Sequence, residues 1–149
     1  MTGVWHAAPV AQSLRGPLIG YAAAALGGVL GALARWGVAR ALLSPAGGWP
    51  WATLLVNVTG CALIGALLAV LLARFPGHPW LRPFLATGVL GGYTTFSAFA
   101  VEVVRLVDDG AVATAVAYVA ASVLGGLLAV VAGLTVGRRC LLGTREDAR

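Results

Sequence analysis

The stretch 91-GGYTTFSAFAVE-102 lies inside a long apolar segment, yet its composition is unusual for that setting. Two glycines open it, residues with hydroxyl groups follow, two phenylalanines are interleaved with these, and a carboxylate ends it. Glycine and β-branched threonine are weak helix formers, so this stretch predicts a broken or unwound turn near the middle of a helix. The consequence of such a break depends on whether the segment folds in water or in lipid.

The composition of the whole chain indicates a membrane protein. Of its 149 residues, 60% are hydrophobic and 10% are charged, whereas an average soluble domain has about 45–50% and 25%. Four stretches without formal charge are long enough to cross a bilayer, namely 16–34, 51–73, 83–101 and 110–137. The chain therefore has room for four spans with short connections and for no separate soluble domain.

We predict an all-α integral membrane protein that forms a single membrane domain over residues 1–149, with its third helix broken near the middle. The helices are expected at about 18–43, 51–73, 82–106 and 110–137, with tails at 1–17 and 138–149. Turn-forming residues mark the breaks at 44–50, 74–79 and 108–110. Because each break is short, successive helices are expected to be antiparallel neighbours. Residues 1–16 contain no apolar run, so a cleaved signal peptide is not expected.

All ten basic residues are arginines, and their distribution predicts an orientation. Four crossings place both termini and the loop between the second and third helices on one side. That side has seven arginines, the other has Arg40 and Arg105, and Arg35 lies within the first helix. By the positive-inside rule the termini are expected to be cytoplasmic, in a bacterial-type plasma membrane. The net charge of +5 thus serves anchoring in membrane lipid, and nucleic acid is not an expected partner.

Residues that carry enzymatic chemistry are not grouped in this sequence. Cys61 and Cys140 show no metal-ligand spacing, while His6 and His78 lie in the tail and in a loop. We find no pairing of nucleophile and base, no metal cluster and no phosphate-binding loop, so the chain is not expected to be an enzyme.

Polar residues within the predicted spans are costly in lipid and therefore informative. Thr53 and Asn57 are four residues apart in the second helix, and Thr114, Tyr118 and Ser122 are spaced by four in the fourth. Such edges, like the glycines at 27, 31, 125 and 126, are typical of helix packing in membranes. A full amide at mid-span demands several partners, so Asn57 instead favours a polar cavity.

The residues after the predicted break favour weak attraction of an anion. Phe96, Phe99 and Glu102 recur in three-residue steps and share a helix face, which Thr95 adjoins. Phenyl edges carry the positive end of the ring quadrupole, so paired rings favour an anion without a formal charge. Backbone carbonyls freed at the break can bind a cation.

Three segments, 31-GALARW-36, 53-TLLVNVTG-60 and 91-GGYTTFSAFAVE-102, in this order and spacing, resemble the CrcB/Fluc family of small fluoride channels. The resemblance covers all four predicted helices, about residues 18–137. It implies an antiparallel dimer of the dual-topology type with two pores. Such a dimer lets cytoplasmic fluoride leave the cell down its electrochemical gradient and so reduces fluoride toxicity.

The resemblance also implies roles for individual residues. Phe96 and Phe99 match the phenylalanines that line the pore, and Asn57 matches the asparagine beside them. Gly91 and Thr94 match positions whose backbone carbonyls hold a structural sodium ion at the dimer interface. The remaining candidates for the fluoride pathway are Arg35, near an aqueous vestibule, and the polar residues Thr53, Thr95, Ser97, Glu102, Tyr118 and Ser122.

Two features depart from the family pattern and suggest a second hypothesis. Ala98 and Ala100 stand where the motif commonly has further hydroxyls, which weakens the polar track. The arginine count commits the chain to one orientation, although homodimers that insert both ways need nearly balanced loop charges. The working channel is then a heterodimer with an oppositely oriented paralogue.

Two other classes of function remain as alternatives. A four-helix proton-coupled exporter of the small multidrug type needs a carboxylate in its first helix, and residues 18–43 contain none. A non-conducting partner subunit needs only packing faces, which leaves Asn57 and the phenylalanine pair without a role.

Overall fold

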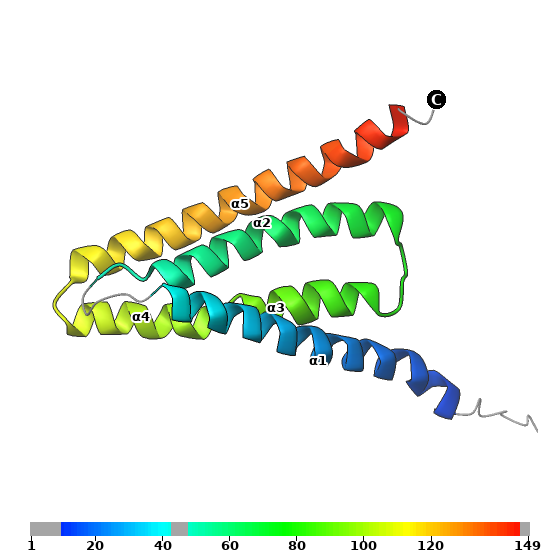
Figure 1. Cartoon of the computed structure of the whole chain (residues 1–149), viewed down its shortest axis with the longest axis horizontal. Helices are drawn as coiled ribbons and strands as arrows, with labels where there is room; N and C mark the ends of the chain where they lie inside the picture. Colours follow the sequence, from blue (N-terminus) through cyan, green and yellow to red (C-terminus); the bar gives the residue numbers. More distant parts are fainter. Residues whose placement is uncertain (1–9, 43–47, 147–149) are drawn as a thin grey trace, which may run out of the picture.

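The computed structural model describes residues 10–42 and 48–146, and every regular element in this part is helical (Figure 1). The elements are α1 (Val10–Ala41), α2 (Trp51–Arg74), η1 (Pro83–Leu90), α3 (Gly91–Tyr93), α4 (Phe96–Asp108) and α5 (Val112–Glu146). Four segments are long and apolar enough to cross a membrane, namely Pro17–Ala41, Trp51–Arg74, Pro83–Asp108 and Val112–Leu141. The prediction of an all-α protein with four membrane spans is confirmed.

The first and last helices extend further than the sequence predicted. α1 begins at Val10 rather than near residue 18, and α5 continues to Glu146 rather than ending near residue 137. Arginine and leucine are good helix formers and no proline follows residue 137, so the fourth helix continues beyond its apolar part. Residues 1–9 and 147–149 of the predicted tails, and residues 43–47 of the predicted first break, lie outside the described residues.

The third span is built from three pieces. Its first part, η1, is a π-helix, followed by the single turn α3 and then by the longer helix α4. Thr94 and Thr95 lie between α3 and α4 with extended backbone angles, at φ −75° and ψ 157° for Thr94 and φ −150° and ψ 121° for Thr95. The helical hydrogen bonds of the third span are therefore interrupted at Thr94 and Thr95.

Alternate spans, rather than successive ones, make the main helix contacts. α2 packs along α5, and α1 packs along η1 and α3, with far fewer contacts between these two pairs. In Figure 1, α1 and α5 are the outer helices, and they diverge toward the end of the molecule at which the C-terminus lies. Successive spans also contact one another, as the sequence predicted, but less extensively, because a short loop fixes the direction of the next helix and does not fix its main packing partner.

Glycines explain why these pairs approach so closely. A Cβ added at Gly31 would overlap the carbonyl oxygen of Val89, and one at Gly133 would overlap that of Ala62. By contrast, a Cβ at Gly125 would make ordinary van der Waals contact. Small residues let helix backbones meet in lipid, where no hydrophobic effect drives helices together. The tight part of the α2–α5 contact therefore lies further along α5 than residues 125 and 126, where the sequence pattern placed it.

Candidate functional site

The side chain of Asn57 on α2 bonds to the backbone where the third span is interrupted. Its Nδ2 donates to the carbonyl oxygen of Thr95 at 2.9 Å, and its Oδ1 accepts from the backbone N–H of Thr95 at 2.8 Å. The backbone of Thr95 thus finds in a side chain of α2 the partners that a continuous helix would supply. An amide is suited to this position because it offers a donor and an acceptor side by side.

The carbonyls of Gly91 and Thr94 are among those that lose their usual helical donors at the break. The N–H of Thr95 bonds to Asn57 instead of the carbonyl of Gly91 one turn earlier. The N–H of Ala98 bonds to Thr95 Oγ1 at 3.2 Å, as expected for a helix N-cap, instead of the carbonyl of Thr94. In lipid such carbonyls require another partner, and oxygen atoms of this kind are ligands for a hard cation.

A second cluster joins three helices around one carboxylate. Thr53 Oγ1 on α2 donates to Glu102 Oε1, and the Tyr118 hydroxyl on α5 donates to Glu102 Oε2, each at 2.7 Å. Thr53 and Tyr118 are both buried, and Tyr118 has no exposed surface. A carboxylate accepts hydrogen bonds and donates none, so both hydroxyl protons point at Glu102. The two hydroxyls are therefore oriented to bind an anion, and the Glu102 carboxylate is the anion they bind here.

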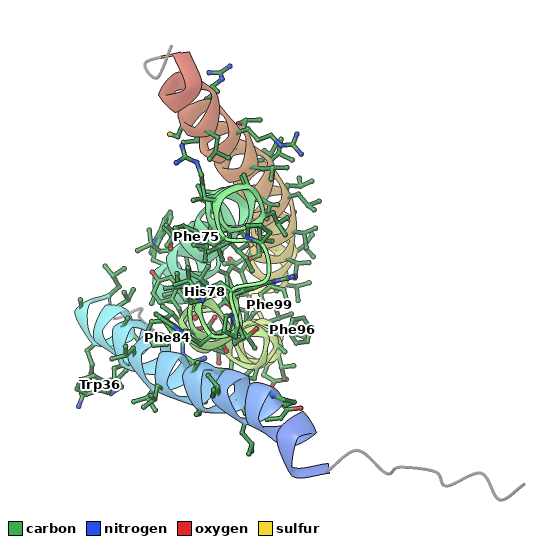
Figure 2. All side chains as sticks on the ribbon, turned by 90° about the vertical axis from the view of Figure 1, so that its right-hand side faces the viewer. Trp36, Phe75, His78, Phe84, Phe96 and Phe99 are labelled. Carbon is green, nitrogen blue, oxygen red and sulfur yellow. The ribbon has the colours of Figure 1, made fainter. Side chains whose placement is uncertain are left out.

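Aromatic rings lead from the break to this cluster. The ring centroids of Phe96 and Phe99 lie 5.8 Å apart, those of Phe99 and Tyr118 lie 5.3 Å apart, and Trp49 meets Tyr118 edge-on at 6.0 Å. Phe96 is 79% exposed in the single chain, whereas Phe99 is half-buried. Figure 2 shows both phenylalanines on the side of the bundle away from Trp36. The exposed ring of Phe96 thus continues this row onto the outer surface of α4.

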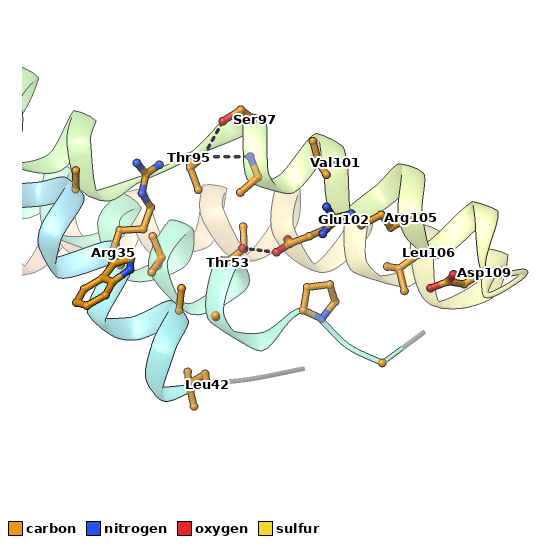
Figure 3. Close-up of a pocket in the computed structure, with 18 residues that line it drawn as sticks. Arg35, Leu42, Thr53, Thr95, Ser97, Val101, Glu102, Arg105, Leu106 and Asp109 are labelled. Atoms are coloured by element: carbon orange, nitrogen blue, oxygen red, sulfur yellow. Dashed lines mark hydrogen bonds between the residues drawn. The ribbon is translucent and has the colours of Figure 1, made fainter. Parts of the chain in front are cut away.

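A cavity of about 760 Å³ opens beside these groups. Arg35 enters it from α1, Thr53 from α2, and Glu102 and Arg105 from α4 (Figure 3). Asp109 also lines it, its other walls are largely apolar, and its volume far exceeds that of a single ion. Among the described residues, no group of three or more histidine, cysteine or acidic side chains is placed to hold a metal ion.

Most of the predicted site residues lie together in the structure, either in the cluster around Glu102 or along the wall of the cavity. Thr95 and Ser97 share a hydroxyl contact of 3.2 Å, and both line the cavity with Arg35. The hydroxyl oxygen of Ser122 is buried and makes no hydrogen bond within the described part of the chain. Gly91, by contrast, is exposed on the surface of the single chain.

Sequence reasoning missed three residues at this site. Arg105 lines the cavity, although the sequence analysis counted it only among the arginines that set orientation. It lies three residues after Glu102 on one helix, and this spacing could have indicated that the two share a face. Thr59 and Tyr93 bond to each other across the break at 3.1 Å. That contact joins residues 34 positions apart, so no local pattern could have indicated it.

Comparison with known proteins gives a consistent result. The family model described as CrcB-like protein, Camphor Resistance (CrcB), matches residues 22–134, which include every candidate site residue. "Fluoride-specific ion channel FluC 1" of Streptomyces coelicolor is 44% identical over 139 residues, which is 93% of this chain and 90% of the relative. "Fluoride-specific ion channel FluC" of Paracoccus denitrificans is 53% identical over 116 residues, 76% of this chain and 90% of the relative. The protein of the same name from Bordetella petrii is 48% identical over 116 residues, 78% and 89% of the two chains.

Proposed function

This chain belongs to the CrcB family, and from that premise we propose that it is a fluoride-specific ion channel that lets fluoride leave the cytoplasm down its electrochemical gradient. The observation that carries the proposal is the convergence of the Thr53 and Tyr118 hydroxyls on one anionic group within the membrane. Relatives at 44–53% identity are named as fluoride channels, which supports the choice of ion.

Fluoride is small and strongly hydrated, so a pore must replace its water with hydrogen-bond donors. Thr53 and Tyr118 supply two such donors, and both protons are directed at Glu102 in the absence of the ion. We infer that fluoride takes these donors when the Glu102 carboxylate swings aside, because the two anions cannot share the same protons. The carboxylate keeps the hydroxyls oriented between ions, and its negative charge keeps fluoride binding weak enough for release.

The cavity lined by Arg35 and Arg105 is the proposed vestibule. Its charged lining residues are Arg35 and Arg105 together with Glu102 and Asp109, so the two guanidinium groups attract anions locally within a lining whose formal charges balance. The phenylalanine edges of Phe96 and Phe99 then provide weak attraction along the path. In the described part of the chain the bonds to Glu102 come from the neutral hydroxyls of Thr53 and Tyr118, so neutral donors rather than a guanidinium group would hold the ion at that point.

The carbonyls of Gly91 and Thr94 are the proposed ligands of a structural sodium ion. The fit rests on the redirected N–H groups of Thr95 and Ala98, which leave both carbonyls without helical donors. Two carbonyls do not complete a sodium shell, and Gly91 is exposed. A second subunit that presents the same surface about a two-fold axis would supply the missing oxygens, which supports a dimer.

For that dimer we favour a heterodimer with an oppositely oriented paralogue. The arginines are divided seven to two between the two sides, which favours one orientation of this chain. Ala98 and Ala100 also remove hydroxyls from the α4 part of the path. This chain alone is therefore expected to conduct poorly and to conduct well with its paralogue.

The test is fluoride efflux from proteoliposomes, measured with an electrode. Wild type is compared with Phe96→Ile and Asn57→Asp, with and without a paralogue in the same liposomes. We expect strong efflux from the mixed wild-type preparation and much weaker efflux from both variants. Robust efflux from this chain alone would refute the heterodimer, and no fluoride flux under either condition would refute the channel.

A further inference from the structure

Tyr93 is bonded to α2 by a contact that the proposed pathway does not use. Its hydroxyl lies 3.1 Å from Thr59 Oγ1. Thr59 directs its single hydroxyl proton to its own helix, with the carbonyl oxygen of Leu55 at 2.6 Å and that of Val56 at 3.3 Å. The Tyr93 hydroxyl is therefore the donor and Thr59 is the acceptor.

The ring of Tyr93 lies against α2 at Gly60, where that helix has no side chain. A Cβ added at Gly60 would overlap Thr94 Cγ2 and would come within 3.5 Å of Tyr93 Cδ1. Gly60 is buried, so the missing side chain is what allows the break to approach the α2 backbone. Thr59 and Gly60 hold Tyr93, while Asn57 holds Thr95. α2 thus contacts the residue on either side of Thr94.

These contacts fix the direction of the Thr94 carbonyl. This carbonyl and the N–H of Thr95 belong to the same peptide unit, which is trans. In a trans peptide the two groups point in opposite directions. Because the N–H points at Asn57 Oδ1, the carbonyl of Thr94 points away from the Asn57 amide. The other end of this peptide unit is Thr94, whose Cγ2 lies against Gly60, and the preceding residue Tyr93 is held by α2 through its ring and hydroxyl.

We propose that the Tyr93–Thr59 pair is a positioning device for the cation site, which sets sodium affinity by holding the Thr94 carbonyl in its binding direction without touching the ion. The inference rests on the proposed function, in which the carbonyls of Gly91 and Thr94 bind sodium. Tyr93 and Thr59 then act on sodium affinity, whereas Thr53, Tyr118 and Glu102 act on the anion.

The test uses Tyr93→Phe, which removes the hydroxyl and keeps the ring over Gly60. Sodium affinity is measured in detergent as the sodium concentration equal to Kd, which is obtained by fitting the logarithmic rise of the thermal unfolding temperature with sodium, with an organic cation replacing sodium. Loss of one hydrogen bond is expected to raise this concentration about two- to tenfold. Sodium dependence of fluoride efflux, with the paralogue where needed, is expected to shift by the same factor.

Two further variants separate positioning from general stability. Thr59→Val removes the acceptor and is expected to give the same shift, and the double variant no further shift, because both changes remove one bond. Tyr21→Phe on α1 is the matched control, since Tyr21 is 72% exposed, and it is expected to keep wild-type sodium dependence.

Two results would overturn the proposal. One is Tyr93→Phe with the sodium half-saturation of wild type. The other is wild-type protein whose unfolding does not depend on sodium, which would also remove the proposed cation site. Fluoride efflux by wild type in the same preparation distinguishes this second result from failure of the channel assignment.

Discussion

Asn57 and Thr95 form a two-point contact in which one side chain satisfies both backbone groups of a residue in another helix. The contact joins α2 to the break in the third span at the level where helical hydrogen bonds are missing. An unsatisfied backbone group in hydrocarbon costs several kcal/mol, so the break depends on this asparagine.

Replacement of Asn57 by alanine is expected to destabilise the protein. Both bonds to Thr95 are lost, and each buried group left without a partner costs about 1–3 kcal/mol. The measurement is reversible unfolding in detergent. Thr135→Ala is the control, because that hydroxyl bonds to the carbonyl of Ala132 within its own exposed helix face. Equal stability of the two variants would show that water or lipid headgroups reach the break.

Alanine at Gly31 is expected to separate α1 from η1. The new Cβ would overlap the carbonyl oxygen of Val89, and overpacking of this kind costs about 1–3 kcal/mol. Gly37 on the same helix is the control, because no atom of the described residues lies within 4 Å of a Cβ added there. Gly37→Ala is expected to stabilise α1 by about 0.5–1 kcal/mol through helix propensity. A stable Gly31→Ala variant would contradict the observed backbone contact.

The sequence predicted the local features of this fold better than its long-range contacts. Charge-free stretches located the four spans, and the weak helix formers at 91–95 indicated where the third span is interrupted. The pairing of alternate spans depends on which glycine faces meet, and that is a property of two helices at once. For the same reason Asn57 was recognised as needing partners, but Thr95 could not be identified as the partner.

The carboxylate cluster illustrates the same limit. Glu102, Thr53 and Tyr118 were each singled out, yet they come from α4, α2 and α5. Their spacing in sequence carries no information on a shared acceptor. The π-helical form of η1 was likewise not predicted, because its apolar composition is equally suited to an α-helix.

Removal of either hydroxyl donor to Glu102 is expected to reduce fluoride efflux. Thr53→Val and Tyr118→Phe each remove one donor from the path, and a hydrogen bond to a charged group is worth about 1.5–3 kcal/mol. Efflux is expected to fall about tenfold or more if that bond is made to fluoride at the barrier. Thr135→Val and Tyr21→Phe provide the same chemical changes away from the cluster. Wild-type efflux in both cluster variants would exclude these hydroxyls from the path.

Neutralisation of the vestibule arginines is expected to reduce efflux in a salt-dependent way. One charge about 7 Å from an ion in water changes its local concentration about threefold, so Arg35→Gln and Arg105→Gln should each lower efflux by about that factor at low ionic strength. The effect should shrink in high salt as screening increases. Arg40→Gln is the control, because Arg40 is on the same helix as Arg35 but does not line the cavity, and its guanidinium stacks on Trp36 at 5.2 Å from the ring centroid. An equal effect of Arg40→Gln would show that overall charge, not the cavity, matters.

Orientation in the membrane can be tested with cysteine labelling. Cys140 is exposed on α5 and follows Arg138 and Arg139, at the end predicted to be cytoplasmic. In intact cells a membrane-impermeant maleimide is expected to leave Cys140 unlabelled and to label it after permeabilisation. Asp109→Cys, in a background without the native cysteines, should be labelled in intact cells. Asp109 is exposed in the turn between α4 and α5, at the opposite end of α5 from Cys140. Labelling of half the molecules at each position in intact cells would mean that the chain inserts both ways, and a separate, oppositely oriented partner would then be unnecessary.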